Sequence, residues 1–376
     1  MDRREFVKVG AGAVAAAAAL AGRQRFSSAE NPRQPSTPPS GAGGLLTGSF
    51  MFLVHPNPWN AAYCDETLFW KEENWRALLQ DMHRIGMDTA IWVGTAFWGR
   101  PLFPGYEKKV GRQYKMGCQD PMKVVADEAD RLGMKLFYGI GFRGRACQVR
   151  DYARLDKPWP DVWFCWNTAQ AEALIERYGG RPSFAGLYIG YEIDYHAHHV
   201  ELYEKLVKEH LRPAIGDVKL LASPGNLGIE VRDLGTFPKD VARTGIDILA
   251  PQDYGGRSHD VAQALDNVRR NAQALERVAG PLRDIGVALW ANCELFVHEA
   301  SPDGRGMWNA GPIERVREQI ALQSPLVDKL ICFIYQGAMN RHTGLVTIGH
   351  TSSDTLYQGY VAYLNEKFPD RFGIVA

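Results

Sequence analysis

From residue 48 onward, short continuous apolar runs alternate with longer segments in which apolar residues recur every three or four positions. Continuous apolar runs are typical of parallel strands covered on both faces, and the longer period is typical of amphipathic helices. The predicted strands are residues 50–54, 89–93, 136–140, 184–191, 218–222, 246–251, 287–291 and 330–335. The predicted helices are residues 75–85, 122–132, 169–178, 200–211, a short segment near 240, 261–278, 312–323 and 355–367.

A repeated motif supports this alternation. Arg84-Ile85-Gly86-Met87 leads into the second predicted strand, and Arg131-Leu132-Gly133-Met134 leads into the third. Each glycine falls where a helix ends and a left-handed residue is needed. Eight such units predict a (β/α)₈ barrel that occupies residues 48–376 as a single domain. A doubly wound open sheet is the alternative, but no glycine-rich phosphate fingerprint follows any predicted strand.

The composition narrows the class of partner. The chain has 376 residues, 45% of them hydrophobic, which is enough for a large core. It carries 43 basic and 43 acidic residues, so its formal net charge is zero. A nucleic acid or an anionic membrane would need a positive field that this balance does not supply. We therefore expect an uncharged or weakly charged substrate and no nucleic-acid partner.

The amino terminus predicts export. Residues 1–29 begin with a charged segment and continue with an apolar, alanine-rich run at 9–21, as secretion signals do. The paired Arg3 and Arg4 resemble the twin-arginine export signal, which implies the twin-arginine translocase as a partner and a periplasmic or secreted location. A membrane anchor is the alternative. Its apolar core of about 13 residues is shorter than the roughly 20 that span a bilayer, so we expect no stable membrane insertion. Residues 30–47 are predicted to form a flexible leader.

Six cysteines fit an oxidising compartment without proving a disulfide. Cys147 and Cys165 lie in one long predicted loop and are the first pair to test. Cys293 and Cys332 lie in strand-like runs and are predicted to be buried thiols.

Two glutamates are the main candidates for chemistry. In a (β/α)₈ barrel the active site lies at the carboxyl ends of the strands, and Glu192 and Glu294 follow the fourth and seventh predicted strands. A desolvated carboxyl suits a general acid, and a second carboxylate can attack an anomeric carbon or activate water. Glycoside hydrolysis needs such a pair. The alternative is that both are solvated or paired with Arg143, Arg145 or Arg341.

Other polar and aromatic side chains at or near strand ends are predicted to contact a substrate. They are His55, Trp92, Trp98, Asp194, Gln252, Asp253, Tyr254, Trp290, Asn292 and Tyr335. An aromatic ring fits the apolar face of a sugar, and polar groups fix its hydroxyls. Asp194 and Asp253 are expected to position substrate or water, or to supply the second carboxylate if Glu294 points elsewhere.

Loops after the strands are rich in tryptophan. Those singled out are Trp59, Trp98, Trp159, Trp163, Trp166 and Trp308. They could line a sugar site, or they could fill space beneath long loops. The loop 142–167 is long enough to form a wall or lid.

A histidine cluster offers a metal-dependent alternative. His196, His198 and His199 follow Asp194 directly, and imidazoles near carboxylates can bind zinc or manganese. Their spacing resembles no metal motif, so a solvated helix entrance is favoured. We predict no metal and no cofactor.

Two family resemblances sharpen this prediction. The pair Glu192 and Glu294 resembles the retaining (β/α)₈ glycosidase clan, whose acid/base follows strand four and whose nucleophile follows strand seven. This resemblance implies an acid/base role for Glu192 and a nucleophilic role for Glu294. Tyr335 takes the place of the aromatic residue that the clan carries at strand eight.

The second resemblance spans nearly the whole mature chain. It is to a bacterial barrel family described as a domain of unknown function and treated by analogy as glycoside hydrolases. The residues that carry it are 79–82, 84–92, 186–193, 248–253 and 289–296. We therefore predict a glycoside hydrolase acting on an oligosaccharide or glycoside. A metal-dependent sugar isomerase or lyase using Glu192, Asp253, Glu294 and a histidine, and a non-catalytic carbohydrate-binding barrel, are the alternatives.

Overall fold

A computed structural model describes residues 43–53, 67, 69–97, 100–101, 117–141, 159–193, 195, 197–258, 260–299, 307–349 and 351–374. Its central feature is a closed barrel with strand order β1-β12-β9-β8-β7-β6-β5-β2, in which every neighbouring pair is parallel. The barrel strands are β1 (Leu46–Met51), β2 (Thr89–Trp92), β5 (Lys135–Ile140), β6 (Phe184–Ile189), β7 (Leu220–Ala222), β8 (Ile248–Leu249), β9 (Ala288–Glu294) and β12 (Lys329–Phe333). The chain is thus a (β/α)₈ barrel, as predicted.

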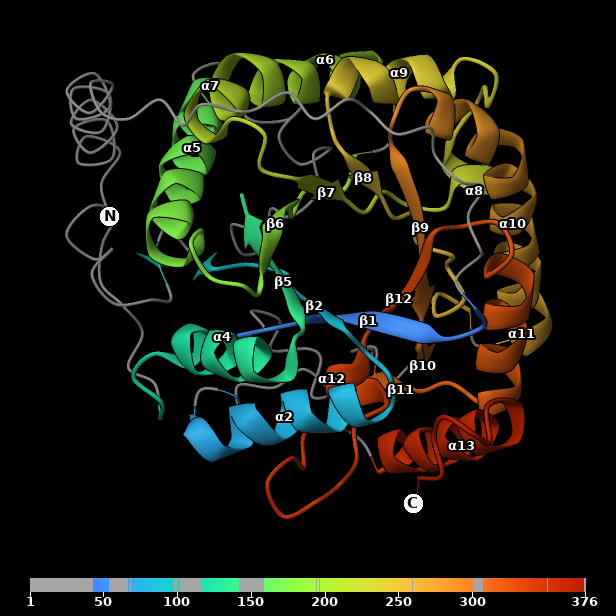
Figure 1. The fold of residues 1–376 in the computed structure, drawn as a ribbon. Helices are drawn as coiled ribbons and strands as arrows, with labels where there is room; N and C mark the ends of the chain where they lie inside the picture. The colour runs from blue at the N-terminus through green and yellow to red at the C-terminus, as the bar shows by residue number, and fades with distance from the viewer. Residues whose placement is uncertain are drawn as a thin grey trace.

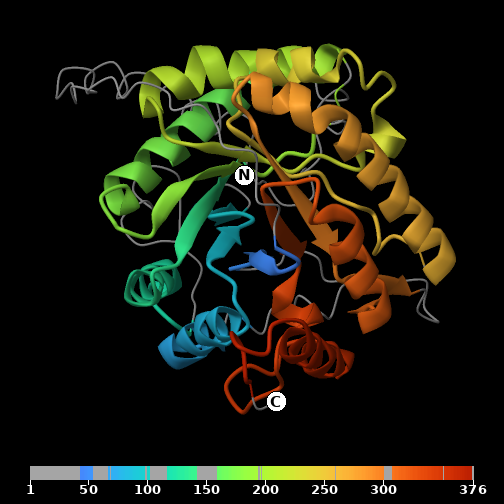
Figure 2. The same cartoon turned by 45° about the vertical axis from the view of Figure 1, so that its right-hand side comes forward.

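Helices surround the strands as an outer ring (Figures 1 and 2). They are α2 (Glu72–Arg84), α4 (Pro121–Leu132), α5 (Trp159–Tyr178), α6 (Ala197–Glu204), the π-helix η4 (Lys205–Leu211), α7 (Arg212–Ile215), α8 (Leu227–Glu230), α9 (Phe237–Thr244), α10 (Val261–Asp284), α11 (Ile313–Gln323), α12 (Tyr335–Ala338) and α13 (Ser352–Lys367). Within the described ranges, none of them has both the length and the apolarity needed to cross a bilayer.

The predicted helix ends have the expected backbone. Asp120 caps α4 by accepting a hydrogen bond from the Lys123 N–H at 3.0 Å, and Gly133 ends the helix at φ 71°. Gly86, the matching glycine before β2, has φ 89°. Both conformations lie in the left-handed region, where a side chain would be strained. The repeated motif therefore does mark the turns into β2 and β5.

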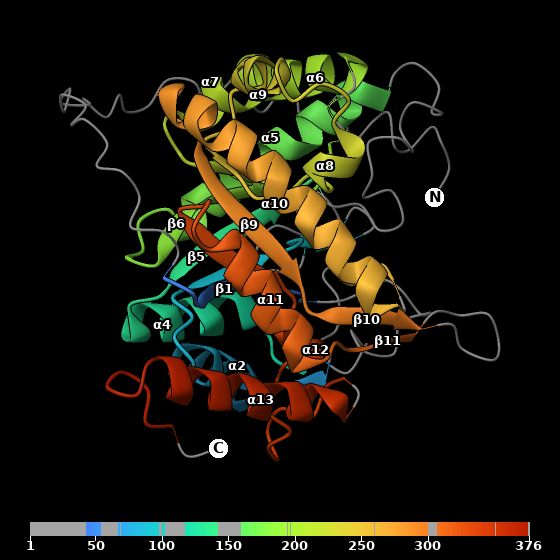
Figure 3. The ribbon, with the colours of Figure 1, turned by 90° about the vertical axis from the view of Figure 1, so that its right-hand side faces the viewer.

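The sequence pattern did not predict two hairpins at the carboxyl ends of the strands. One pairs β3 (Ala96–Phe97) with β4 (Arg100–Pro101), and the other pairs β10 (Phe296–Glu299) with β11 (Met307–Ala310). The second follows β9 almost directly and projects beyond it from the barrel (Figure 3). β1 begins at Leu46, inside the predicted leader. Residues 1–42 lie outside the described part of the chain, so the export signal stays a prediction.

Alternate residues of each strand face the barrel interior. The Phe50 and Tyr188 rings lie 5.1 Å apart although β1 and β6 are not neighbours, so both point across the interior. Phe137 of β5 and Trp290 of β9 meet in the same way, with ring centroids 5.7 Å apart. Because pleated side chains alternate in direction, Asn292 and Glu294 also face inward from β9. This direction decides which candidate residues can meet at the mouth.

Candidate functional site

The mouth at the carboxyl ends of the strands gathers Glu192 after β6, Gln252 after β8, and Asn292 and Glu294 on β9. Gln252 donates a hydrogen bond from Nε2 to Oε1 of Glu192 at 3.1 Å. It also forms an isolated parallel bridge with Asn292, and thus lies beside β9. The two glutamates therefore flank one segment, the loop that follows β8.

Glu192 is half-buried and its main chain is well anchored. The Tyr203 hydroxyl of α6 donates to the carbonyl of Tyr191, and the Gly190 N–H donates to the carbonyl of Ile140 at 3.0 Å. The Tyr191 ring is fully buried and packs edge-on against Trp163 at 4.5 Å. These contacts hold the segment after β6 while the carboxylate of Glu192 turns toward Gln252.

Glu294 is the last residue of β9 and is 3% exposed. Its Oε2 accepts a hydrogen bond from the Gly256 N–H at 2.9 Å. Burial, followed by the nearby Asp253, raises the pKa of Glu294 from 4.5 to about 8, against the opposing effects of Arg257, the Gly256 N–H and Arg315. Burial therefore favours the protonated form of the Glu294 carboxyl at neutral pH.

A polar layer lies below the two glutamates. Asn292 is 2% exposed and donates from Nδ2 to Oγ of Ser223 at 3.2 Å. Its Oδ1 is buried and accepts no hydrogen bond from the described residues. Gln252 donates to the Ser223 carbonyl at 3.3 Å. The predicted substrate contacts Gln252 and Asn292 thus line the inner wall beneath the mouth, and their role stays a prediction.

Tyr254 lies in the same loop after β8. Its hydroxyl donates to Oε1 of Glu230, and the guanidinium of Arg257 lies 3.4 Å from its ring centroid. Burial raises the pKa of the Tyr254 hydroxyl, which stays protonated. The Arg257 side chain is exposed and adds a cation to the rim of the mouth beside Tyr254.

Asp253 is not a substrate contact, contrary to the prediction. It is fully buried, and its pKa is raised by that burial. Gln252 faces inward beside Asn292, so the next residue in the alternating chain faces outward. Its carboxylate meets Gln319 and Gln323 of α11 at 2.7 and 3.0 Å.

Two predicted aromatic contacts also face the helices. Trp92 is fully buried and packs against Trp75 of α2 at 5.6 Å between ring centroids. Tyr335 is fully buried and lies 6.5 Å from the Tyr357 ring of α13. Neither ring can reach a ligand in the mouth, so both predictions were wrong. Proximity to a strand end did not reveal on which side of the barrel wall these side chains lie.

Trp290 faces the interior but at the opposite end. It stands in register with Lys329, the first residue of β12, and the Lys329 ammonium lies 5.7 Å from its ring centroid. Lys329 in turn pairs with Asp88, which precedes β2. Trp290 therefore fills the amino-terminal end of the barrel, and its prediction as a substrate contact was wrong.

Sequence reasoning missed Phe333, the inward aromatic residue of β12. Phe333 stands in register with Glu294 and is partly exposed. Its ring lies 5.8 Å from both Phe50 and Phe52 and 6.0 Å from Phe296. A cis peptide bond joins it to Ile334. The available signal was the alternation along β12, but it required the end of that strand to be known.

Several candidates lie outside the described residues. They are His55, Trp59, Trp98, Cys147, Asp194 and His196. The side chains of Trp159, His198 and Trp308 also lie outside the described part of the chain. His199 is buried in α6, and no group of three metal-ligating side chains occurs among the described residues. Trp163 is buried beneath the segment after β6. Cys293 and Cys332 are buried free thiols, as predicted.

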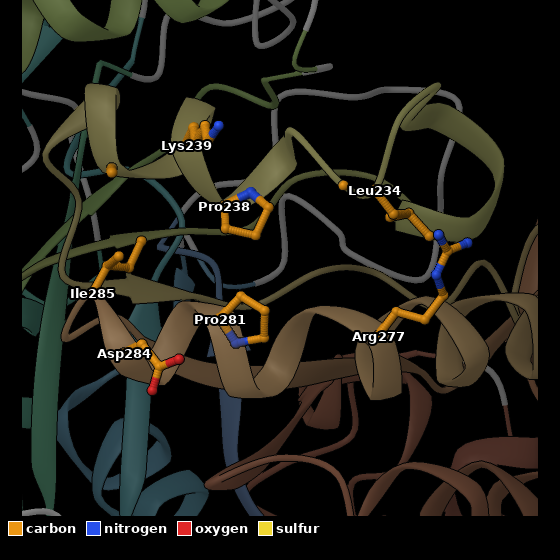
Figure 4. A pocket seen from close by; sticks show the side chains of 9 residues that line it. Leu234, Pro238, Lys239, Arg277, Pro281, Asp284 and Ile285 are labelled. Carbon is orange, nitrogen blue, oxygen red and sulfur yellow. The ribbon is translucent and has the colours of Figure 1, made fainter.

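A hollow on the outer surface is separate from this site. It has a volume of about 410 Å³ and lies between α9 and α10, where Pro238, Arg277 and Pro281 line it (Figure 4). Asp284 and Ile285, which also line it, come just before β9 begins. The hollow therefore lies toward the amino-terminal ends of the strands, away from Glu192 and Glu294.

Known proteins agree with this architecture. The chain matches the family model described as Domain of unknown function (DUF4434) over residues 46–343. No curated protein matches it. A "putative alpha-L-fucosidase" from Bacteroides thetaiotaomicron VPI-5482 superposes with a TM-score of 0.62 and 17% identity, covering 92% of this chain and 99% of its own. An endo-1,4-beta-D-mannanase from Thermotoga petrophila RKU-1 gives a TM-score of 0.51 and 11% identity, covering 84% and 99%. At these identities the likeness is one of fold.

Proposed function

The chain belongs to the family described as Domain of unknown function (DUF4434), and we propose that it is a glycoside hydrolase with Glu192 as acid/base and Glu294 as nucleophile. The observation that carries this proposal is that two glutamates flank one loop at the barrel mouth. Gln252 donates to Glu192 at 3.1 Å, and Gly256 donates to Glu294 at 2.9 Å. Paired carboxylates across a sugar site are what glycosidic bond cleavage requires.

The surroundings of each glutamate suit a different step. Glu192 is half-buried and takes a hydrogen bond from a neutral amide, so it can exchange a proton with a leaving-group oxygen at the mouth. The Gly256 N–H fixes one oxygen of Glu294, which orients the carboxylate for attack on an anomeric carbon. A covalent glycosyl intermediate at Glu294 would then be hydrolysed by water that Glu192 activates.

The lining favours a neutral sugar. Phe333 offers a partly exposed ring in register with Glu294, and such a ring fits the apolar face of a pyranose. Gln252 and Asn292 supply amide groups for hydroxyls. The names of the fucosidase-like protein and the mannanase also point to carbohydrate chemistry on this fold.

The protonation of Glu294 makes its role testable. A nucleophile must be ionised, so kcat/KM should rise with pH through about 8 as Glu294 loses its proton. The opposite limb, with activity lost above this pH, would make Glu294 the general acid and exchange the roles of the two glutamates.

A panel of aryl glycosides and of oligosaccharides labelled at the reducing end tests the function itself. We expect E192Q and E294Q to lower kcat by at least about 10³-fold, while E314Q, an exposed glutamate at the start of α11, keeps wild-type rates. Azide should restore turnover to a small-residue variant at Glu294 and yield a glycosyl azide. Near-native rates in E294Q would contradict the proposal, and loss of activity on chelation would favour a metal-dependent sugar enzyme.

A further inference from the structure

Helix α11 buries three polar side chains against the barrel beside its apolar residues Val316 and Ile320. Arg315, Gln319 and Gln323 are spaced four residues apart, so they lie on one side of the helix. Their exposures are 1%, 0% and 0%. Burial of polar groups is costly unless they are hydrogen-bonded. Their partners are the segments that carry Asp253 and Glu294.

Asp253 uses both carboxylate oxygens. Oδ1 accepts hydrogen bonds from the N–H of Gly255 at 2.9 Å and from the N–H of Glu294 at 3.1 Å. Oδ2 accepts from Nε2 of Gln319 at 2.7 Å and Nε2 of Gln323 at 3.0 Å. The carboxylate therefore joins the loop after β8, the end of β9 and α11.

Arg315 makes the complementary contacts. Its guanidinium donates to the carbonyls of Gly255 at 2.7 Å, Glu294 at 3.0 Å and Phe296 at 2.9 Å. Gln319 adds a hydrogen bond to the Glu294 carbonyl at 3.1 Å. The N–H of Glu294 is thus bound by a buried carboxylate, and its C=O by a buried guanidinium and an amide.

We infer that Asp253, Arg315 and Gln319 are positioning residues for Glu294, which fix its main chain on both sides and place one negative and one positive charge beside its carboxyl. None of them needs to touch a substrate. That this arrangement serves catalysis rests on the proposed function, whereas the arrangement itself does not.

The two charges act on Glu294 with opposite signs. Asp253 raises the pKa of Glu294, and Arg315 lowers it. Arg257 and the Gly256 N–H, both from the loop after β8, also act on this carboxyl, and both lower its pKa. Removing the Asp253 charge should therefore ease ionisation of Glu294, and removing the Arg315 charge should oppose it.

The test follows the titration of Glu294 without any substrate. For each variant, the free energy of unfolding is measured between pH 4 and 9 and compared with that of the same variant carrying E294Q; the pH dependence of the difference reports the midpoint for Glu294. We expect D253N to move this midpoint to lower pH by about one unit or more and R315M to move it to higher pH. R315K, which keeps the charge, should stay near the wild-type midpoint.

Matched controls lie near the amino-terminal end of β8, the strand that precedes the loop carrying Asp253. Asp247 and Arg212 also bind main-chain groups around β8, so D247N and R212M should lower stability without moving the midpoint of Glu294. If R315M does not fold, the Glu294 midpoints of D253N and R315K test the inference. The amide introduced by D253N faces Nε2 of Gln319 and Gln323, so it is accommodated if Gln319 turns its amide over and accepts through Oε1, a buried atom that accepts no hydrogen bond within the described chain.

Midpoint shifts of the same sign in D253N and R315M, or a shift in D253N no larger than in D247N, would overturn the inference. If the protein hydrolyses glycosides, the limb of kcat/KM that reports Glu294 should move with the same sign as the stability midpoint. Shifted midpoints without turnover of any glycoside would leave the positioning role standing and refute the proposed function.

Discussion

An aspartate and an arginine lie near each end of β8 and are arranged in different ways: Arg212 comes from α7 and Arg315 from α11. At the amino-terminal end, Asp247 accepts a hydrogen bond from the Leu220 N–H at 2.8 Å and pairs directly with Arg212 at 2.6 Å. Arg212 also donates to nearby carbonyls, including those of Val218 at 2.8 Å and Gly245 at 3.0 Å. The Arg212 side chain is 26% exposed and the Asp247 side chain is 22% exposed, so water solvates part of each.

At the carboxyl-terminal end the two charges are buried and work through the main chain. Asp253 binds N–H groups and side-chain amides, and Arg315 binds three carbonyls. The peptide groups of Gly255 and Glu294 lie between them. Both charges consequently remain close to the carboxyl of Glu294, and both influence its pKa.

The difference separates stability from function along a single strand. At the amino-terminal end, a direct and partly solvated ion pair joins neighbouring strands. Because water screens it, its electrostatic contribution to stability is small. Two buried charges at the other end hold a segment and also set the electrostatics of a carboxyl that we propose reacts. This division agrees with the general rule that the amino-terminal face of such a barrel serves stability and the carboxyl-terminal face serves chemistry.

The largest expected effect is on the pH dependence of stability at the carboxyl-terminal end. Glu294 has a pKa of about 8 in the fold against 4.5 for an ordinary glutamate, so between these values the folded protein holds a proton that the unfolded chain has released. The contribution of Glu294 to stability is full below pH 4.5 and is lost as the pH rises to 8. E294Q has no such proton to release. The difference in unfolding free energy between E294Q and wild type should therefore shift in favour of E294Q by up to about 5 kcal/mol between pH 4.5 and pH 8.

Urea denaturation at a series of pH values measures this gain, and Glu128 supplies a control of opposite sign. The hydrogen bond from Arg131 is the main cause that lowers the pKa of Glu128. E128Q should therefore be less stable than wild type at neutral pH, and its deficit should shrink as the pH falls below 4.5. A flat difference between E294Q and wild type would show that Glu294 titrates normally.

The second prediction compares the two arginines. R315M leaves three buried carbonyls and the Asp253 charge without their cation, and should cost about 3–5 kcal/mol of unfolding free energy. R212M removes a more exposed side chain and should cost about 1–2 kcal/mol. Chemical denaturation of both variants at one pH gives the difference. Equal losses would mean that burial does not distinguish the two ends.

The smallest effect concerns the interior rings at the two ends. F333L should raise KM for a sugar substrate by about 10-fold, because a lost ring contact is worth about 1–1.5 kcal/mol. W290F should lower the melting temperature and leave KM unchanged, since Trp290 packs against Phe137 at the closed end. Steady-state kinetics and thermal unfolding separate these outcomes. A raised KM in W290F would place substrate deeper than the mouth.

The sequence predicted the architecture well because its signals are local. Apolar runs, helical spacing and the glycines at positions 86 and 133 each report on their own neighbourhood, and eight repeats of that pattern leave few folds open. Glu192 and Glu294 followed from the same count, since both come at strand ends. Trp92 and Tyr335 failed for a different reason. The alternation of a strand decides which side a residue faces, and a shift of one position reverses it.

The order of eight strand and helix units, and the two glutamates that follow strands, could therefore be predicted from the sequence alone. The tertiary structure alone decided what surrounds those glutamates. Asp253, Glu294 and Arg315 are separated along the chain, and nothing local marks them as neighbours. They meet because β8, β9 and α11 pack together, and burial in that contact strengthens their mutual electrostatic effect. Whether the carboxyl of Glu294 holds a proton depends on this packing.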